Sequence, residues 1–163
     1  MSKLTRLLLV ANLLLGCVGC DQATKLVARA HLSDGPSIEF LHDTVRLTYA
    51  ENPGAFLGLG ASLSRPARTL ILQVGVSVLT LGLVLSAALW PRLTKPQVIA
   101  LTLLGASGLG NLIDRILYDG RVTDFLNLGV GELRTGIFNV ADVFGVVGVA
   151  LMLLHRSVAA PPN

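Results

Sequence analysis

Charged residues are scarce in this chain: only 14% of its 163 residues are Asp, Glu, Lys or Arg, whereas a water-soluble domain carries about 25%. The net charge of +3 comes from scattered basic groups and not from a basic face, which argues against a nucleic-acid-binding protein. The chain has two cysteines and three histidines that lie far apart in sequence. We therefore expect neither a disulfide-stapled secreted fold nor a metal site.

Hydrophobic residues make up 52% of the chain, and the mean hydropathy is +0.68. The charges gather in short clusters between long uncharged stretches, as in membrane proteins. We expect a mainly α, polytopic membrane protein with four transmembrane helices, and one integral membrane domain over residues 1–163. The spans are expected at about 4–20, 69–90, 98–113 and 137–154. The first span has a basic start, as a signal sequence also does.

The distribution of charge predicts the orientation. The N-terminus, the connection between the second and third spans and the C-terminus carry basic residues and no acid. These basic residues are Lys3, Arg6, Arg92, Lys95 and Arg156. All ten acids lie in or beside the other two connections, residues 21–68 and 114–136. By the positive-inside rule both termini are cytoplasmic and these two loops are extracytoplasmic. Any chemistry carried by the acids should therefore face outward.

The first outer loop is too long for a turn and contains strand-like pieces at Ser37–Leu41 and Thr44–Thr48. This pattern predicts a small extracytoplasmic β-element at the membrane surface. The segment Asp124–Phe138 can supply further strands to it.

Asp142 is the sharpest functional signal, because an ionisable group within a span costs at least about 2.5–3.5 kcal/mol unless something compensates. The alternative is a hydrated carboxylate near the interface. Asn139 lies three residues earlier and shares its helical face. Asn111, Asp114 and Arg115 share a face at the outer end of the third span, where a structural Asp–Arg pair is equally consistent.

Other polar residues have ordinary explanations when taken singly. Asp21 and Lys25 have the spacing of a solvated helical ion pair. The segment Asn52–Phe56 has the composition of a turn. Asp124, taken alone, is typical of a solvated carboxylate in a loop. Together, however, these clusters come from the ends of three spans and from both outer loops. They would converge at the outer membrane surface, as a site requires.

Five segments carry a resemblance: Asp21-Gln-x-x-Lys25, Asn52-Pro-Gly-Ala-Phe56, Gly110-Asn-Leu-Ile-Asp-Arg115, Val122-Thr-Asp-Phe125 and Phe138-Asn-Val-Ala-Asp142. In order and spacing they resemble lipoprotein signal peptidase, the type II signal peptidase of bacteria, over nearly the whole chain. The resemblance implies an aspartic protease whose catalytic residues are Asp124 and Asp142. It also implies a set of supporting residues: Asp21, Lys25, Asn52, Gly54, Asn111, Asp114, Arg115, Asn139 and Ala141.

The same resemblance implies the reaction. The substrate would be a diacylglyceryl-modified prolipoprotein, cut on the amino side of its lipidated cysteine in the bacterial cytoplasmic (inner) membrane. The active site would face the periplasm, without metal or cofactor, and globomycin-type peptides would inhibit it. Membrane lipid would surround it. Two adjacent carboxylates suffice chemically, since one stays protonated while the other acts as a base.

Two departures from the family pattern concern the neighbourhood of the site. The turn Asn52–Phe56 is one residue shorter than the usual motif, and Val143 stands where a small hydroxyl residue is expected.

Three rival hypotheses remain. Gly105-Ala-Ser-Gly108 matches a rhomboid-type serine protease motif, but its histidine would be His155, 13 residues and roughly 20 Å along the helix from Asp142. Leu14-Leu-Gly-Cys17 looks like a lipobox, with a second candidate at Cys20, so the chain could itself be a lipoprotein lipidated at Cys17. The third is a non-enzymatic small membrane protein.

Overall fold

The computed structural model describes residues 1–54, 60 and 62–155. Phe56 of the turn motif and Arg156 of the basic tips lie outside the described residues. The elements follow one another in chain order as α1 (Lys3–Leu32), β1 (Ile38–Phe40), β2 (Val45–Asn52), α2 (Arg65–Arg68), η2 (Thr69–Gly75), α3 (Val76–Leu89), α4 (Lys95–Leu117), β3 (Val122–Val130), β4 (Leu133–Arg134) and α5 (Val140–Leu154). This confirms the expected fold class of a helical membrane protein with a small sheet.

Three helical stretches among the described residues are long and apolar enough to cross a membrane: Lys3–Leu32, Arg65–Leu89 and Lys95–Leu117. The second consists of α2, the π-helical turn η2 and α3 in succession. The fourth apolar helix, α5, is shorter, at 15 residues. The chain is therefore a multi-pass membrane protein.

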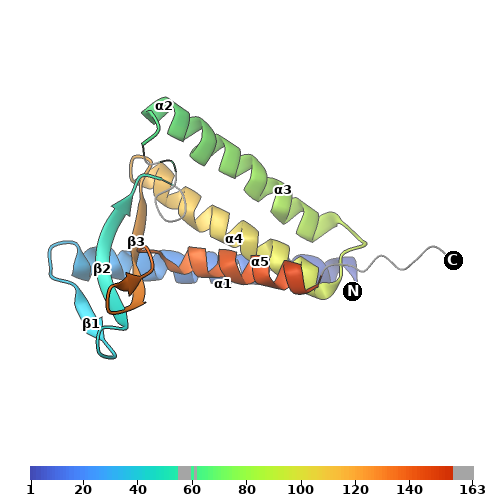
Figure 1. Ribbon diagram of the computed structural model, residues 1–163. Helices are drawn as coiled ribbons and strands as arrows, with labels where there is room; N and C mark the ends of the chain where they lie inside the picture. Colours follow the sequence, from blue (N-terminus) through green and yellow to red (C-terminus); the bar gives the residue numbers. More distant parts are fainter. Residues whose placement is uncertain (55–59, 61, 156–163) are drawn as a thin grey trace.

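Helix α4 packs against α1, α3 and α5, and it is the best buried of the spans. Glycines at its contacts with α3 and α5 allow this close packing. A Cβ added at Gly105 would meet Val84 of α3 at 2.6 Å, and one at Gly148 of α5 would meet Leu104 of α4 at 2.9 Å. Figure 1 shows the helices running from the sheet at one end to the N-terminus and the α3–α4 connection at the other.

The four strands form one antiparallel sheet in the order β1-β2-β3-β4. The sheet lies across one end of the helices (Figure 1). Both strand-like pieces of the first loop form strands, and the segment Asp124–Phe138 supplies most of β3 and all of β4, as expected. The register shifts between Leu47 and Ala50, where β2 has a bulge.

The register makes the sheet amphipathic. Cross-strand partners share a face, so apolar residues of all four strands gather on one side: Ile38, Phe40, Val45, Leu47, Leu126, Leu128, Val130 and Leu133. The opposite side carries the row Glu39, Arg46 and Asn127. At the outer edge of the apolar side Leu133 is 84% exposed.

Helix α1 does not end at Cys20, the last residue of the expected first span, but continues to Leu32. Its last turns pack Ala28 and Leu32 against Phe125 of β3. Asp21 and Lys25 consequently lie within a helix among other elements of the protein.

Candidate active site

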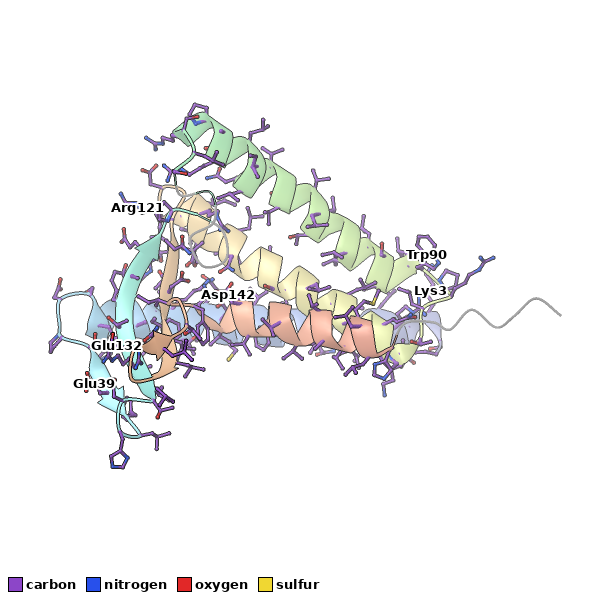
Figure 2. All side chains as sticks on the ribbon, viewed as in Figure 1. Lys3, Glu39, Trp90, Arg121, Glu132 and Asp142 are labelled. Carbon is purple, nitrogen blue, oxygen red and sulfur yellow. The ribbon has the colours of Figure 1, made fainter. Side chains whose placement is uncertain are left out.

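Asp124 and Asp142 border one small cavity. Asp124 comes from β3, and Asp142 from the first turn of α5, at the end of the helices that faces the sheet (Figure 2). The cavity has a volume of about 10 Å³, close to the space that one water molecule needs. It is lined by Asn52, Asn111, Arg115, Val122, Asp124, Asn139 and Asp142.

The start of α5 fixes the Asp142 side chain through a capping box. The Asn139 side chain accepts a hydrogen bond from the Asp142 backbone N–H at 3.1 Å, and Asp142 Oδ2 accepts one from the Asn139 N–H at 3.2 Å. The Asp142 carboxylate and the Asn139 side chain therefore each satisfy one backbone donor that a helix start would leave without a partner. This is the compensation that a carboxylate within an apolar helix requires.

Asp124 is 2% exposed, so it is not the loop carboxylate in water that its sequence position alone suggested. Asn52 Nδ2 donates to its Oδ2 at 2.9 Å, and Asn139 Nδ2 donates to its Oδ1 at 2.7 Å. The pairing of β2 with β3 brings Asn52 alongside, since Asn52 is the partner of Val122. Both oxygens of Asp124 are thereby oriented.

Asn111 of α4 connects the two aspartates. Its Nδ2 donates to Asp142 Oδ1 at 3.0 Å, and its Oδ1 accepts from Asn139 Nδ2 at 3.0 Å. Because Asn139 Nδ2 also reaches Asp124, a chain of side-chain hydrogen bonds runs from one carboxylate to the other. Such a network fixes the relative positions of both groups.

A buried charge cluster lies behind this network. Lys25 Nζ contacts Asp21 at 2.9 Å, Asp114 at 3.4 Å and Asn111 Oδ1 at 2.9 Å. All three charged residues are at most 2% exposed, so the interpretation of Asp21 and Lys25 as a solvated pair is wrong. Asp21 also accepts from the Ala141 N–H, which holds the start of α5 to α1. The cluster therefore positions α1, α4 and α5 relative to one another.

Arg115 donates to backbone carbonyls and not to Asp114, so the two residues do not form the simple pair that their spacing also allowed. Its Nη1 donates to the Asn111 carbonyl at 3.1 Å, and its Nη2 donates to the Gly54 carbonyl at 2.8 Å. The Gly54 N–H in turn donates to Asn52 Oδ1 at 2.8 Å. Arg115 and Gly54 thus hold the turn from which Asn52 reaches Asp124. Among the described residues, the buried Nε of Arg115 has no partner.

The pKa of Asp124 is raised to about 6, and burial is the largest cause. The negative charge of Asp142 also contributes to the rise, whereas the hydrogen bonds from Asn52 and Asn139 oppose it. A carboxyl group that titrates near neutrality can hold or release a proton under physiological conditions.

The structure brings every residue expected for the site to this region. The lining of the cavity also includes Val122, and the cluster includes Gln22, which donates to Asp21 and Asp114 at 3.1 Å. Neither residue is among those expected for the site from the sequence, although Gln22 lies within the Asp21–Lys25 motif. The Thr123 N–H, which donates to Asp114 at 2.9 Å, was not expected either. Val143, at the unusual position, is 40% exposed.

Two rival hypotheses lose their structural basis. Cys17 is buried in the middle of the continuous helix α1, where it packs against Leu103 and Ala106 of α4. The hypothesis that the chain is itself a lipoprotein would require cleavage just before Cys17, within this helix. Ser107 lies next to Gly145 of α5, whereas His155 follows the far end of that helix. A Ser107–His155 pair is therefore not formed.

Comparisons with known proteins give matches over most of the chain. A family model described as signal peptidase (SPase) II matches residues 13–158. A lipoprotein signal peptidase of Bifidobacterium longum is 34% identical over 156 residues, which cover 92% of this chain and 79% of that protein. One of Moorella thermoacetica is 35% identical over 138 residues, covering 82% and 85%. A solved structure of a bacterial membrane enzyme has a TM-score of 0.77 at 27% identity and covers 94% of this chain and 93% of that one.

Proposed function

The chain belongs to the signal peptidase II family, and on this premise we propose that it removes lipoprotein signal peptides as an aspartic endopeptidase with Asp124 and Asp142 as its catalytic pair. One observation carries the proposal. The two carboxylates come from separate elements, border the same small cavity and are joined through Asn139 and Asn111.

The chemistry follows from the closeness of the two acids. Two carboxylates at one site do not both ionise readily, so one proton is shared by the pair near neutral pH. The ionised member takes a proton from a water molecule, which attacks the scissile carbonyl carbon. The protonated member donates a hydrogen bond to the carbonyl oxygen as negative charge develops there. The proton then passes to the leaving amine, without a covalent enzyme intermediate.

The amide side chains orient the acids for this reaction. Asn52 and Asn139 each donate to one oxygen of Asp124, and Asn111 donates to Asp142. These bonds leave the carboxylates little freedom to rotate away from the cavity. Preorganisation of this kind lowers the cost of reaching the transition state.

The substrate in this proposal is a prolipoprotein whose cysteine already carries diacylglycerol, cut on the amino side of that cysteine. The protein would lie in the bacterial inner membrane with both termini in the cytoplasm and the site facing the periplasm. The distribution of charge supports this orientation. The basic Lys3 lies at one end of the helices, whereas the acids Glu39 and Glu132 lie at the end that carries the sheet (Figure 2).

Processing of a purified prolipoprotein tests the function. Wild-type protein should release the signal peptide from a diacylglyceryl-modified substrate and leave the unlipidated form of the same substrate intact. The mass of the product identifies the cut. Asp142→Asn should be inactive, and EDTA should leave the wild-type rate unchanged. Loss of activity in EDTA would contradict the aspartic mechanism.

We also propose that globomycin-type peptides compete for this site, because a peptide backbone held between the two aspartates would exclude the substrate. Binding should then weaken in Asn52→Ala, since Asn52 lines the cavity. The exposed acid Asp34 gives the control, Asp34→Asn, which should bind as the wild type does. Equal affinity of all three proteins would place the inhibitor elsewhere.

A further inference from the structure

A larger groove of about 830 Å³ lies beside the small cavity, and Arg115 lines both. Its walls come from α2, η2, the end of α4 and the segment leading into β3. Four arginines and two acids line it, namely Arg65, Arg68, Arg115, Arg121, Glu51 and Asp119. The groove therefore has an excess of positive charge.

Both acids of the groove already form an ion pair with an arginine. Arg65 forms an ion pair with Asp119, and Arg121 Nη1 contacts Glu51 at 2.5 Å. The remaining positive charge belongs to Arg68 and Arg115, since neither has an acid within salt-bridge distance in the part of the chain that the structure describes. Arg115 serves the active site through its bonds to Gly54 and Asn111. Arg68 is thus the cation that nothing described so far explains.

The polar side chains of Arg68 and Gln73 both line the groove. Arg68 is half-buried, and neither residue's side chain has a hydrogen bond or ion pair with any other described residue. Gln73 lies in the π-helical turn η2, a local geometry that is frequent at functional sites. A half-buried guanidinium and an amide N–H₂ together offer several donors to a ligand that accepts hydrogen bonds and carries negative charge.

The depth of these residues in the membrane indicates the source of such a ligand. Arg68 immediately precedes Thr69, where the uncharged part of the second span begins. Leu70, Ile71 and Val74, on neighbouring turns, are more than half exposed, as lipid-facing residues are. Arg68 therefore lies where a span emerges from hydrocarbon into the headgroup layer, and a guanidinium there can reach lipid phosphates.

We propose that the groove binds the phosphate of one anionic phospholipid headgroup, with Arg68 and Gln73 as its donors. The planar guanidinium matches two phosphate oxygens at once, and the Gln73 amide supplies a further donor. Arg65 and Arg121 lie at the same groove, where each is already paired with an acid, so the excess charge that meets the phosphate is that of Arg68 and Arg115. This lipid differs from the substrate of the proposed reaction, because a diacylglyceryl cysteine carries no phosphate.

Short-chain phosphatidylglycerol is the probe that tests the site. Native mass spectrometry of the purified protein in neutral detergent should show saturable binding of one molecule, while diacylglycerol with the same chains should not bind. Arg68→Gln and Gln73→Ala should each weaken the binding about tenfold, as expected for loss of a hydrogen bond to a charged group. Arg92→Gln is the matched control, since Arg92 is an exposed arginine after the other end of the same span.

Three outcomes would overturn the proposal. Equal weakening by Arg92→Gln and Arg68→Gln would indicate a non-specific charge effect. Equal retention of diacylglycerol would mean that the groove takes acyl chains and not the headgroup. Stabilisation by inorganic phosphate that depends on Arg68, with no binding of phosphatidylglycerol, would assign the site to a soluble anion. None of these readouts depends on peptidase activity.

Discussion

The Asp21 carboxylate accepts a hydrogen bond of 2.9 Å from the backbone N–H of Ala141, a residue 120 positions further along the chain. The acceptor sits at the start of α5, where the helix dipole favours negative charge. The other oxygen of Asp21 is 2.9 Å from Lys25 Nζ. Helix α1 therefore holds the first turn of α5, and with it Asp142.

Substitution of Gly110 tests this relationship. A Cβ at Gly110 would lie 2.6 Å from Asp21 Oδ2 and 3.3 Å from the Ala141 Cβ. Gly110→Ala should displace Asp21, lower the melting temperature and reduce turnover by about tenfold or more, because displacements near 1 Å are costly in catalysis. Gly16→Ala is the control, since nothing lies within 4 Å of a Cβ there. Normal turnover by Gly110→Ala would contradict the positioning role of Asp21.

The pH dependence of kcat/KM tests the titration of the pair. The profile should contain a limb with a midpoint near 6, the pKa of Asp124. The Asn52 hydrogen bond lowers that pKa because it stabilises the ionised carboxylate. Its removal in Asn52→Ala should therefore raise the pKa and move the midpoint to higher pH by about one unit.

Asp43→Asn, at the far turn of the sheet, provides the comparison for this experiment. Its profile should overlay the wild-type profile. A midpoint that moves to lower pH in Asn52→Ala would show that Asn52 does not stabilise ionised Asp124.

Arg6 stabilises the opposite end of the protein. It is 6% exposed and donates to the carbonyls of Trp90, Pro91 and Leu93, which connect α3 to α4. Arg6→Gln should lower the free energy of unfolding by about 1–3 kcal/mol, because carbonyls in that connection lose their charged donor. Melting in detergent measures the change, with the exposed neighbour Lys3 substituted as Lys3→Gln for comparison. Equal melting temperatures would rule out this role.

Fluorescence can test whether the sheet lies at the membrane surface. Leu133 lies on the apolar face of the sheet and is 84% exposed, whereas Glu39 lies on the opposite face. Trp90 is the single tryptophan of the chain, so Trp90→Phe provides a dark background. In that background brominated lipids should quench Leu133→Trp strongly and Glu39→Trp, on the polar face, weakly. The reverse order would mean that the apolar face does not rest on lipid.

Hydropathy and alternation suffice to predict much of this fold. Uncharged runs mark the membrane helices, and strand patterns mark β1 and β2, because both signals are local. The extension of α1 to Leu32 is less visible, since its last turns mix polar and apolar residues and are stabilised by Phe125. The π-helical turn likewise has no pattern of its own in the sequence.

The features of the site that could not be predicted from the sequence depend on contacts between residues far apart in the chain. The spacing of Asp21 and Lys25 is the same in a solvated pair and in a buried one, and only the arrival of Asp114 and Asn111 from α4 distinguishes them. Asn139 was expected as a supporting residue, but its bridging bond to Asp124 depends on how β3 meets α5. Arg6 was interpreted from its charge alone, whereas its partners lie more than 80 residues away.

The central claim is that Asp124 and Asp142 act as one catalytic pair, and turnover of a lipidated prolipoprotein by Asp124→Asn, Asp142→Asn and the double variant measures it most directly. Asn keeps the shape of Asp but cannot serve as the base. Each single variant should lose several orders of magnitude in turnover, the double variant should lose little more, and all three should melt close to the wild type. The exposed Asp34 lies outside every motif, so Asp34→Asn should keep most activity. Wild-type turnover by Asp124→Asn, or losses that multiply in the double variant, would contradict the paired mechanism.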